Sequence, residues 1–296
     1  MAVILDGKLV RSAVIKELKA KVAELSPVLG APGLAVIQLG ENPASTAYVN
    51  NKEKYAGKAG IRAEVHRLPE ATPEIELHTL IAQLNGRADV HGMIVQMPLP
   101  AHIDTDSALA AVATHKDVDG LTPISQGLLW SGRAGLRSCT PAGVMRILDH
   151  YGVSPFGRRV VIVGRSNLVG KPLAAMMLER HATVTICHSR TPDLADVCRS
   201  ADILVAAAGR AGLITKAHVK PGAVVVDVAT NYVETGELDE YGAPITKLTG
   251  DVLFDEVEPV ASMITPVPGG VGPMTIAMLL SNVVTAWSVK SAAQSA

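Results

Sequence analysis

Short apolar runs alternate with helical patterns in the first part of the chain, which predicts repeated βα units. Leu34–Leu39 is an apolar run that fits a strand covered on both faces of a parallel sheet. Asn42 then supplies an N-cap, Pro43 the first helical position and Gly60 a left-handed stop, so a helix should run from 43 to 59. The pattern continues with strands over 61–68 and 90–97, a helix between them that begins after Thr72-Pro73 and stops near Asn85-Gly86, and another helix over 104–114.

A second group of apolar runs predicts a doubly wound parallel sheet in the later part of the chain. Four runs, at 159–163, 183–187, 203–207 and 223–227, fit strands with helical segments between the first three. A helix over about 141–151 should precede them. The last pattern, from Met274 to about Lys290, is one long helix with an apolar face that must pack on something, and we expect it to return to the first domain.

The segment 121–140 separates the two groups. It is rich in Gly, Ser and Pro and has weak periodicity, so we predict that the chain crosses between domains there. The expected fold is α/β with two α/β domains, the second a Rossmann-like doubly wound parallel sheet. The predicted limits are 1–121 plus 274–296 for the first domain and 141–272 for the second.

Composition agrees with a two-domain enzyme and excludes several other classes. A chain of 296 residues with 48% apolar residues can build two cores. Its 27 basic and 28 acidic residues leave no electrostatic footprint for nucleic acid or an anionic membrane. The N-terminus turns polar at Asp6 and lacks a basic leader, and the apolar stretch 276–287 is too short to cross a bilayer. We therefore expect a cytoplasmic protein with neither nucleic acid nor membrane as a partner.

Cysteine and histidine spacing argues against a disulfide framework and a metal site. Cys139, Cys187 and Cys198 cannot all pair and show no C-x-x-C spacing. The nine histidines are scattered without a ligand pattern. We expect three reduced cysteines and no metal.

The segment 163–170 lies where a dinucleotide-binding turn belongs, between a predicted strand and a predicted helix. Gly164 permits the tight turn, Ser166 replaces the middle glycine of the usual motif and can donate to a phosphate, and Gly170 lets the helix approach the strand. The alternative is an ordinary strand-to-helix turn. The context favours cofactor binding.

The end of the second strand of this sheet favours NADP over NAD. NAD-binding domains usually place an acidic residue there, but this chain has Ser189 and no carboxylate before Asp193. Arg165 and Arg190 could instead bind a 2′-phosphate. The alternative is two solvated arginines.

Tyr48 and Lys52 are the first candidate catalytic residues. They precede the nucleotide-binding turn, whereas a short-chain dehydrogenase would carry a Tyr-x-x-x-Lys pair after it. Four residues apart, they share one face of the predicted helix, where they could also be an idle surface pair. Their weight increases if Gln96 and Asp119, at a strand end and in a loop, converge on them, because a lysine of lowered pKa can act as acid or base near neutral pH.

Two other features fit a substrate site. The carboxylate of Asp119 can accept two donors from an aminopyrimidine edge, although an Asp-Gly pair is also common in turns. The segment Thr265–Thr275 has three prolines and three glycines in eleven residues, which fixes one backbone path that a ligand can approach closely. A purely structural loop is the alternative.

Together these blocks resemble the bifunctional methylenetetrahydrofolate dehydrogenase/cyclohydrolase family, known as FolD in bacteria. The resemblance runs almost end to end and is specific because several blocks occur in the right order. They are 40–45 with Tyr48 and Lys52, then 96–100, 116–120, 164–172, 188–191 and 268–275.

The resemblance implies a function and a role for each candidate residue. The substrate would be 5,10-methylenetetrahydrofolate, oxidised with NADP⁺ and then hydrolysed to 10-formyltetrahydrofolate by a protein that is typically a homodimer. Lys52 would be the acid/base residue of hydrolysis, Tyr48 would orient the folate, Gln96 would position Lys52, and Asp119 would hold the pterin. Substrate contacts are also expected at Pro268, Gly269 and Gly270, and cofactor contacts at Gly164, Arg165, Ser166, Ser189, Arg190 and Thr230.

The chain departs from the family pattern at three places. Tyr55-Ala56 stands where Ala-Cys is frequent, Ser138 stands where proline is usual, and Ala229 replaces a glycine beside the expected nicotinamide pocket. Two rival functions remain at this point: another NAD(P)-dependent dehydrogenase that shares only the Rossmann domain, and a non-catalytic nucleotide-binding regulator. The intact Lys52 and phosphate loop argue against the regulator.

Overall fold

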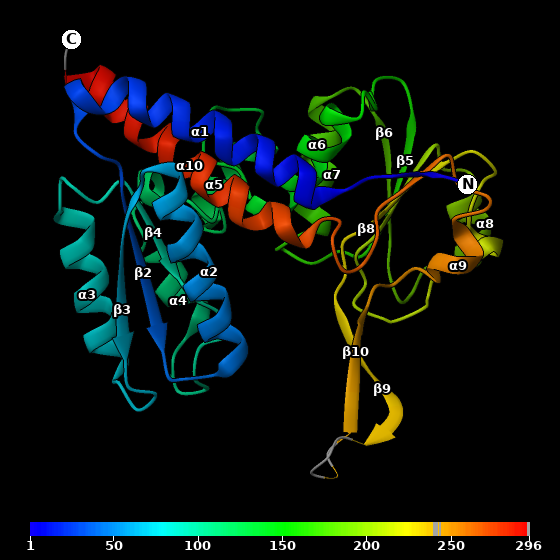
Figure 1. Cartoon of the computed structure of the whole chain (residues 1–296), viewed down its shortest axis with the longest axis horizontal. Coiled ribbons are helices and arrows are strands. Elements are labelled where there is room, and N and C mark those ends of the chain that lie inside the picture. The colour runs from blue at the N-terminus through cyan, green and yellow to red at the C-terminus, as the bar shows by residue number, and fades with distance from the viewer. Residues whose placement is uncertain (239–241, 243, 295–296) are drawn as a thin grey trace. The chain divides into compact units, whose positions relative to one another are not determined.

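Two units make up the fold, and each joins segments that are distant in the sequence. The computed structural model describes residues 1–238, 242 and 244–294 (Figure 1). The first unit, here called the front unit, contains Ser12–Cys139 and Ile276–Ala296; the second, the Rossmann unit, contains Met1–Arg11 and Thr140–Thr275. The helices α1 (Gly7–Leu29) and α10 (Gly272–Gln294) each contribute residues to both units.

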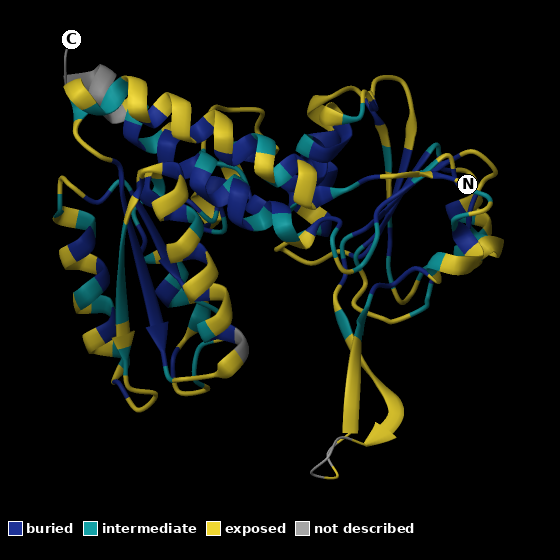
Figure 2. Cartoon of the chain, viewed as in Figure 1, coloured by how far each residue is buried: buried dark blue, intermediate teal, exposed yellow. Residues whose placement is uncertain are grey.

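A three-stranded parallel sheet forms the centre of the front unit. Its order is β3 (Arg62–Leu68), β2 (Gly33–Leu39) and β4 (Gly92–Val95). Every residue of β2 is buried, as its uninterrupted apolar sequence predicts for a strand covered on both faces (Figure 2). The predicted helix is confirmed as α2 (Pro43–Ala59), and α3 (Glu74–Gly86) and α4 (Thr105–Ala110) follow.

Helix α10 returns to the front unit, as the sequence predicts. Asn282 donates hydrogen bonds to the carbonyl oxygens of Val118 and Arg137. A Cβ atom added to Gly92 would lie 2.4 Å from Val118 and 3.0 Å from Val283, so glycine is needed where β4 meets α10. The apolar part of the helix is longer than the predicted stretch 276–287. Its 18-residue window Gly272–Val289 is long and apolar enough to span a membrane, but half of this window is buried inside the protein. That burial is typical of a core helix.

The segment 121–140 belongs almost wholly to the front unit, and the crossing between the units falls only at its end. It contains helix α5 (Pro123–Trp130), where Thr122 is the N-cap and accepts a hydrogen bond from Ser125 N. The division between the units falls after Cys139, within α6 (Cys139–His150). The Thr122-Pro123 pair is a helix start signal that the high content of Gly and Ser concealed.

The Rossmann unit is built on a six-stranded parallel sheet. Its order is β1 (Val3–Ile4), β11 (Met263–Ile264), β8 (Val224–Asp227), β7 (Ile203–Ala206), β5 (Arg159–Val163) and β6 (Thr183–Cys187). The four predicted strands are present, with α7 (Gly170–Glu179) and α8 (Leu194–Arg199) between the first three. The direction of winding reverses between β5 and β7, and ligands of such sheets bind at the carboxyl ends of the strands at that point.

Two parts of this unit differ from the predicted domain limits and elements. The first eleven residues belong here and not to the front unit, because β1 pairs in parallel with β11. The hairpin of β9 (Asn231–Leu238) and β10 (Pro244–Thr249) was not predicted. Its strands are almost wholly exposed, so they show no apolar pattern (Figure 2). A remaining short helix, α9 (Phe254–Val257), precedes β11.

Candidate active site

Helix α2 presents Lys52, and local hydrogen bonds fix the start of that helix. Asn42 Oδ1 accepts a hydrogen bond from Ser45 N at 3.1 Å, which satisfies a free amide of the first turn. Gln38, a buried residue of β2, donates from Nε2 to Thr46 Oγ1 at 2.8 Å. The helix is therefore tied to the central strand at Thr46, six residues before Lys52.

Lys52 and Gln96 meet at the carboxyl ends of the front-unit strands. Lys52 Nζ donates to Gln96 Oε1 at 2.7 Å, and the lysine is only 8% exposed. Gln96 directly follows β4; its backbone N donates to Ile37 O at 2.8 Å and its Nε2 donates to Met97 O at 2.6 Å. The glutamine is thus fixed and presents its oxygen to the lysine.

Asp119 completes a small electrostatic group with Lys52. Burial lowers the pKa of the Lys52 ammonium, and the negative charge of Asp119 partly opposes that effect. Burial in turn raises the pKa of the Asp119 carboxyl group; the charge of Lys52 opposes this shift, whereas that of Asp117 adds to it. A lysine of lowered pKa can exchange a proton near neutral pH, which is the chemistry expected of an acid/base residue.

The loop that carries Asp119 is held by residues whose role the sequence did not show. Lys116 Nζ is buried and donates to the carbonyl oxygens of Leu84, Asn85 and Arg87 at the end of α3. The Asp117 carboxylate accepts hydrogen bonds from the backbone amides of Gly120, Leu121 and Thr122. Both charged residues are therefore structural, and Asp119 is the one acidic residue of 116–120 that interacts electrostatically with Lys52.

Cys139 is a further neighbour that sequence reasoning missed as a site residue. Its Sγ donates to Val118 O at 3.2 Å, and its electrostatic interactions include both Asp119 and Lys52. Burial raises the pKa of the Cys139 thiol. The thiol is therefore neutral, and all three cysteines are free and buried.

Tyr48 lies one turn before Lys52 but in different surroundings. Its side chain is 52% exposed, and among the described residues its hydroxyl group has no hydrogen-bond partner. The structure therefore brings Lys52, Gln96 and Asp119 together and leaves the Tyr48 side chain open to solvent. Its role in orienting substrate stays a prediction.

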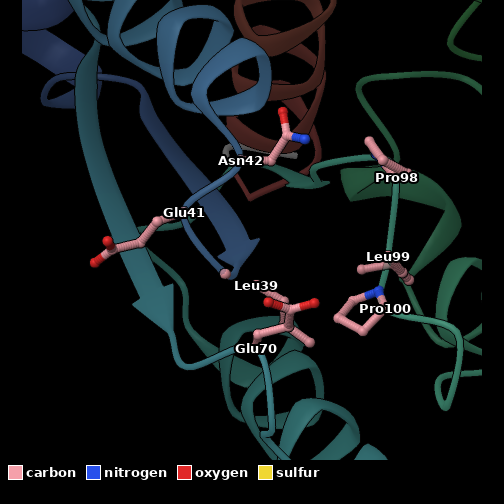
Figure 3. Close-up of a pocket in the computed structure, with 8 residues that line it drawn as sticks. Leu39, Glu41, Asn42, Glu70, Pro98, Leu99 and Pro100 are labelled. Atoms are coloured by element: carbon pink, nitrogen blue, oxygen red, sulfur yellow. The ribbon is translucent and has the colours of Figure 1, made fainter.

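A pocket of about 430 Å³ lies beyond the end of β2, between that strand and residues 98–100 (Figure 3). Leu39 and Pro100 contribute to its wall, and Glu70 gives it an acidic group, whereas the carboxylate of Glu41 points away from the other lining residues (Figure 3). None of the four predicted catalytic residues lines this pocket. The pocket is therefore separate from the group formed by Lys52, Gln96 and Asp119.

The predicted phosphate-binding turn of the Rossmann unit has the close packing that its glycines predict. Gly164 has φ +136°, and a Cβ atom there would lie 2.1 Å from Ala207 O, which follows β7. A Cβ atom on Gly170 would lie 2.1 Å from Gly164 O, so the first turn of α7 approaches the strand end closely. Ser166 Oγ accepts a hydrogen bond from Val169 N at 3.1 Å. The turn fits a pyrophosphate at the N-terminus of α7.

The groups expected to bind the adenosine end of NADP are exposed beyond the carboxyl ends of neighbouring strands of this sheet. Arg165 follows β5, and Ser189 and Arg190 follow β6. Among the described residues neither guanidinium group has a hydrogen-bond or ion-pair partner. NAD-binding domains usually carry an acidic residue at such a strand end. The two guanidinium groups found here can bind a 2′-phosphate instead.

Ala229 and Thr230 lie beyond the carboxyl end of β8. Thr230 is exposed, whereas Ala229 is buried, and its N donates to Asp227 Oδ1 at 3.2 Å. Ala229 is not among the residues of positive φ. The backbone therefore does not require the glycine usual in the family, and the methyl group packs inside the protein.

Asp227 and Asp251 hold the loops at this end of the sheet. Asp227 accepts hydrogen bonds from the amides of Ala229, Asp251 and Val252. The Asp251 carboxylate accepts from Ala208, Gly209 and Arg210 after β7 and from Asn231 Nδ2. Burial, with the charge of Asp251, raises the pKa of Asp227 to about 7.

We expect this shift to make the protein less stable as the pH rises from about 4 to 7. The unfolded chain releases the Asp227 proton near pH 4, and the folded chain keeps it up to about pH 7, so folding takes up a proton in that window. At 1.36 kcal/mol per pKa unit, the free energy of unfolding should fall by up to about 4 kcal/mol through this group. Urea unfolding of the wild type and Asp227→Asn at pH 5 and pH 7.5 measures it. The same pH dependence in both proteins would contradict the assignment.

The glycine-proline loop before α10 packs against the start of α1. Gly7 N donates to Gly269 O at 3.0 Å, and a Cβ atom on Gly7 would lie 1.7 Å from Gly270 O. Gly269 has φ +117°, a conformation that favours glycine. These contacts explain the glycines structurally, so substrate binding at Pro268, Gly269 and Gly270 stays a prediction. Within the part of the chain that the structure describes, no group of three or more His, Cys, Asp or Glu side chains is arranged to hold a metal ion.

Comparison with known proteins agrees with this arrangement. Residues 5–119 match the catalytic domain of the tetrahydrofolate dehydrogenase/cyclohydrolase family, and residues 138–291 match its NAD(P)-binding domain. The chain belongs to the tetrahydrofolate dehydrogenase/cyclohydrolase family. The boundary between the two matched regions lies near the division of the two units at Cys139.

Relatives of this family are similar to the chain over nearly its whole length. The bifunctional protein FolD of Moorella thermoacetica is 53% identical over 285 residues, which cover 96% of this chain and 98% of the relative. FolD of Oleidesulfovibrio alaskensis is 51% identical over 290 residues, with 96% and 98% covered. Membership of the family therefore extends to both units.

Two solved structures share the fold and are also close in sequence. The FolD methylenetetrahydrofolate dehydrogenase/cyclohydrolase of Campylobacter jejuni has a TM-score of 0.91 and 44% identity, covering 98% of this chain and 100% of that chain. FolD of Trypanosoma brucei, solved with NADP cofactor and an inhibitor, has a TM-score of 0.90 and 40% identity, covering 98% of each chain.

Proposed function

We propose that this protein oxidises 5,10-methylenetetrahydrofolate to 5,10-methenyltetrahydrofolate with NADP⁺ and hydrolyses the methenyl product to 10-formyltetrahydrofolate. The observation that carries the proposal is the buried Lys52, bonded to Gln96 and interacting with the charge of Asp119, in a chain of this family. Arg165 and Arg190, whose guanidinium groups have no partner among the described residues, support NADP as the cofactor.

The oxidation asks little acid/base chemistry of the protein. The methylene carbon gives up a hydride, which NADP⁺ accepts, and the two folate nitrogens flanking that carbon share the resulting positive charge. A cation stabilised in this way needs mainly correct placement of the two reactants. We assign that placement to Asp119 on the pterin, to the turn of Gly164, Ser166 and Gly170 on the cofactor phosphates, and to Ser189 and Thr230.

The hydrolysis needs proton transfer, which we assign to Lys52. Water adds to the methenyl carbon and must lose a proton; the neutral amine of Lys52 can accept it. The C–N5 bond then breaks as the added hydroxyl group becomes the formyl carbonyl. N5 takes the proton that the Lys52 ammonium returns, and the hydroxyl proton leaves to solvent, so the net step releases one proton. Gln96 holds the lysine through its Oε1 atom, and burial lowers the pKa of the lysine, which favours both roles.

Three further assignments complete the proposal. Tyr48, exposed on α2, orients the folate, and Pro268, Gly269 and Gly270 contact the substrate. The protein acts in the cytoplasm. It forms a homodimer, which sedimentation velocity tests directly.

An absorbance assay tests the function. Purified protein is mixed with methylenetetrahydrofolate and either NADP⁺ or NAD⁺, and the reduced cofactor and the methenyl product are followed together. We expect NADPH to form and the methenyl intermediate to be hydrolysed. Oxidation of other substrates only would favour another dehydrogenase that shares the Rossmann domain, and NADP⁺ binding without any turnover would favour a regulator.

A further inference from the structure

Side-chain donors hold the backbone on both sides of Asp119. Val118 O accepts hydrogen bonds from Asn282 Nδ2 at 2.8 Å and from Cys139 Sγ at 3.2 Å. Gly120 O accepts from Gln126 Nε2 at 2.6 Å and from Ser138 Oγ at 2.9 Å.

These bonds and two that Gly120 N donates to Asp117 fix three successive peptide groups. The group between 118 and 119 is held through Val118 O. The group between 119 and 120 is held through Gly120 N, which donates to Asp117 O at 3.1 Å and to Asp117 Oδ1 at 3.0 Å. The next group is held through Gly120 O. Because the two peptide groups adjoining a residue set its φ and ψ, the direction of the Asp119 side chain follows from these contacts.

The donors come from three separate segments and use their full capacity. Asn282 on α10 donates from Nδ2 to both Val118 O and Arg137 O, each at 2.8 Å. Gln126 on α5 donates from Nε2 to Gly120 O and to Ser138 Oγ, the latter at 2.7 Å. A primary amide nitrogen carries two hydrogen-bond donors, and in Asn282 and Gln126 both donors bind this loop or the residues beside it.

Ser138 closes the arrangement at a position where this chain differs from the family pattern. Its side chain is 1% exposed, and its hydroxyl accepts from Gln126 and donates to Gly120 O. A proline could supply neither bond. Helix α5 and Ser138 thus form a polar contact with the loop that a proline at 138 would not make.

We propose that Asn282, Gln126 and Ser138 are positioning residues that hold Asp119 beside Lys52 for the folate reactions. The proposal rests on the function proposed above, in which Asp119 binds the pterin. It differs from simple satisfaction of buried carbonyl groups because it requires the three residues to act through Asp119.

A double-mutant cycle with Asp119 distinguishes these two roles. The variants are Ser138→Ala and Asn282→Leu, each alone and combined with Asp119→Ala; Ser138→Thr restores the hydroxyl. Thr72→Val is the matched control, because it removes a buried hydroxyl that donates to Pro69 O in the same unit. The dehydrogenase assay gives kcat/KM for methylenetetrahydrofolate and KM for NADP⁺.

We expect Ser138→Ala and Asn282→Leu each to lower kcat/KM for the folate by about 3- to 30-fold, with little change in KM for NADP⁺. In the Asp119→Ala background the same substitutions should have almost no further effect on kcat/KM. In the otherwise wild-type protein, Ser138→Thr and Thr72→Val should each keep kcat/KM near the wild-type value. Cyclohydrolase activity should depend on pH through the titration of Lys52. In Asn282→Leu this part of the pH–rate profile should move to lower pH, because a displaced Asp119 no longer raises the pKa of Lys52.

Equal losses with and without Asp119 would overturn the proposal, as would an unchanged kcat/KM in Ser138→Ala. If Asn282→Leu does not fold, the cycle with Ser138→Ala and Gln126→Met decides the question. Alanine is smaller than the serine it replaces, and methionine matches glutamine in length, so both variants should fold. A wild-type protein that turns over no methylenetetrahydrofolate would overturn the proposed function itself, and the assignment to Asp119 with it.

Discussion

Lys52→Met is expected to abolish hydrolysis of methenyltetrahydrofolate while NADPH formation from methylenetetrahydrofolate remains measurable. Methionine keeps the length and packing of the lysine stem but cannot exchange a proton. General acid/base catalysis contributes about 100- to 10,000-fold to a rate, so the loss in the hydrolytic step should be at least about 100-fold. Hydride transfer depends on placement of the reactants, and its loss should be much smaller.

Lys54→Met is the matched control for this prediction. Lys54 lies on α2 two residues after Lys52, but it is exposed, so the same substitution should leave both activities near wild type. Each activity is measured separately, the hydrolysis with methenyltetrahydrofolate as substrate and without cofactor. Normal cyclohydrolase activity in Lys52→Met would show that the buried lysine is not the acid/base residue.

The fold was predictable where local sequence signals and packing agree. Asn42, Pro43 and Gly60 mark α2, and its observed limits are those predicted. Strand β2 is apolar throughout because it is buried on both faces. Strand β1 is different: its two residues, Val3 and Ile4, have no periodicity, and their place in the sheet depends on pairing with β11 some 260 residues later.

The candidate site was predictable in its chemistry more than in its support. Convergence of Gln96 and Asp119 on the Tyr48–Lys52 pair was the condition for a catalytic role. The structure places Gln96 in direct contact with Lys52 and Asp119 within electrostatic range of it, whereas Tyr48 is exposed. The sequence did not reveal that Lys116 holds the end of α3, because nothing local distinguishes a buried ammonium group that caps a helix from a catalytic one. Long-range hydrogen bonds decide that difference.

Arg190→Ala is expected to raise KM for NADP⁺ about 10- to 100-fold more than KM for NAD⁺. A hydrogen bond to a charged group contributes about 1.5–3 kcal/mol, and only NADP⁺ carries the 2′-phosphate that this exposed guanidinium group would bind.

The control for Arg190 is Arg158→Ala, which removes an exposed arginine immediately before β5, at the opposite end of the strand from Gly164. It should leave both constants unchanged. Arg165→Ala tests whether the second guanidinium group shares the phosphate; if it does, the double variant should lose most of the preference for NADP⁺. Initial rates with each cofactor at saturating folate give the constants. Equal increases for NADP⁺ and NAD⁺ in Arg190→Ala would mean that the arginine contacts a part common to both cofactors, and the preference for NADP⁺ would then have to come from other residues.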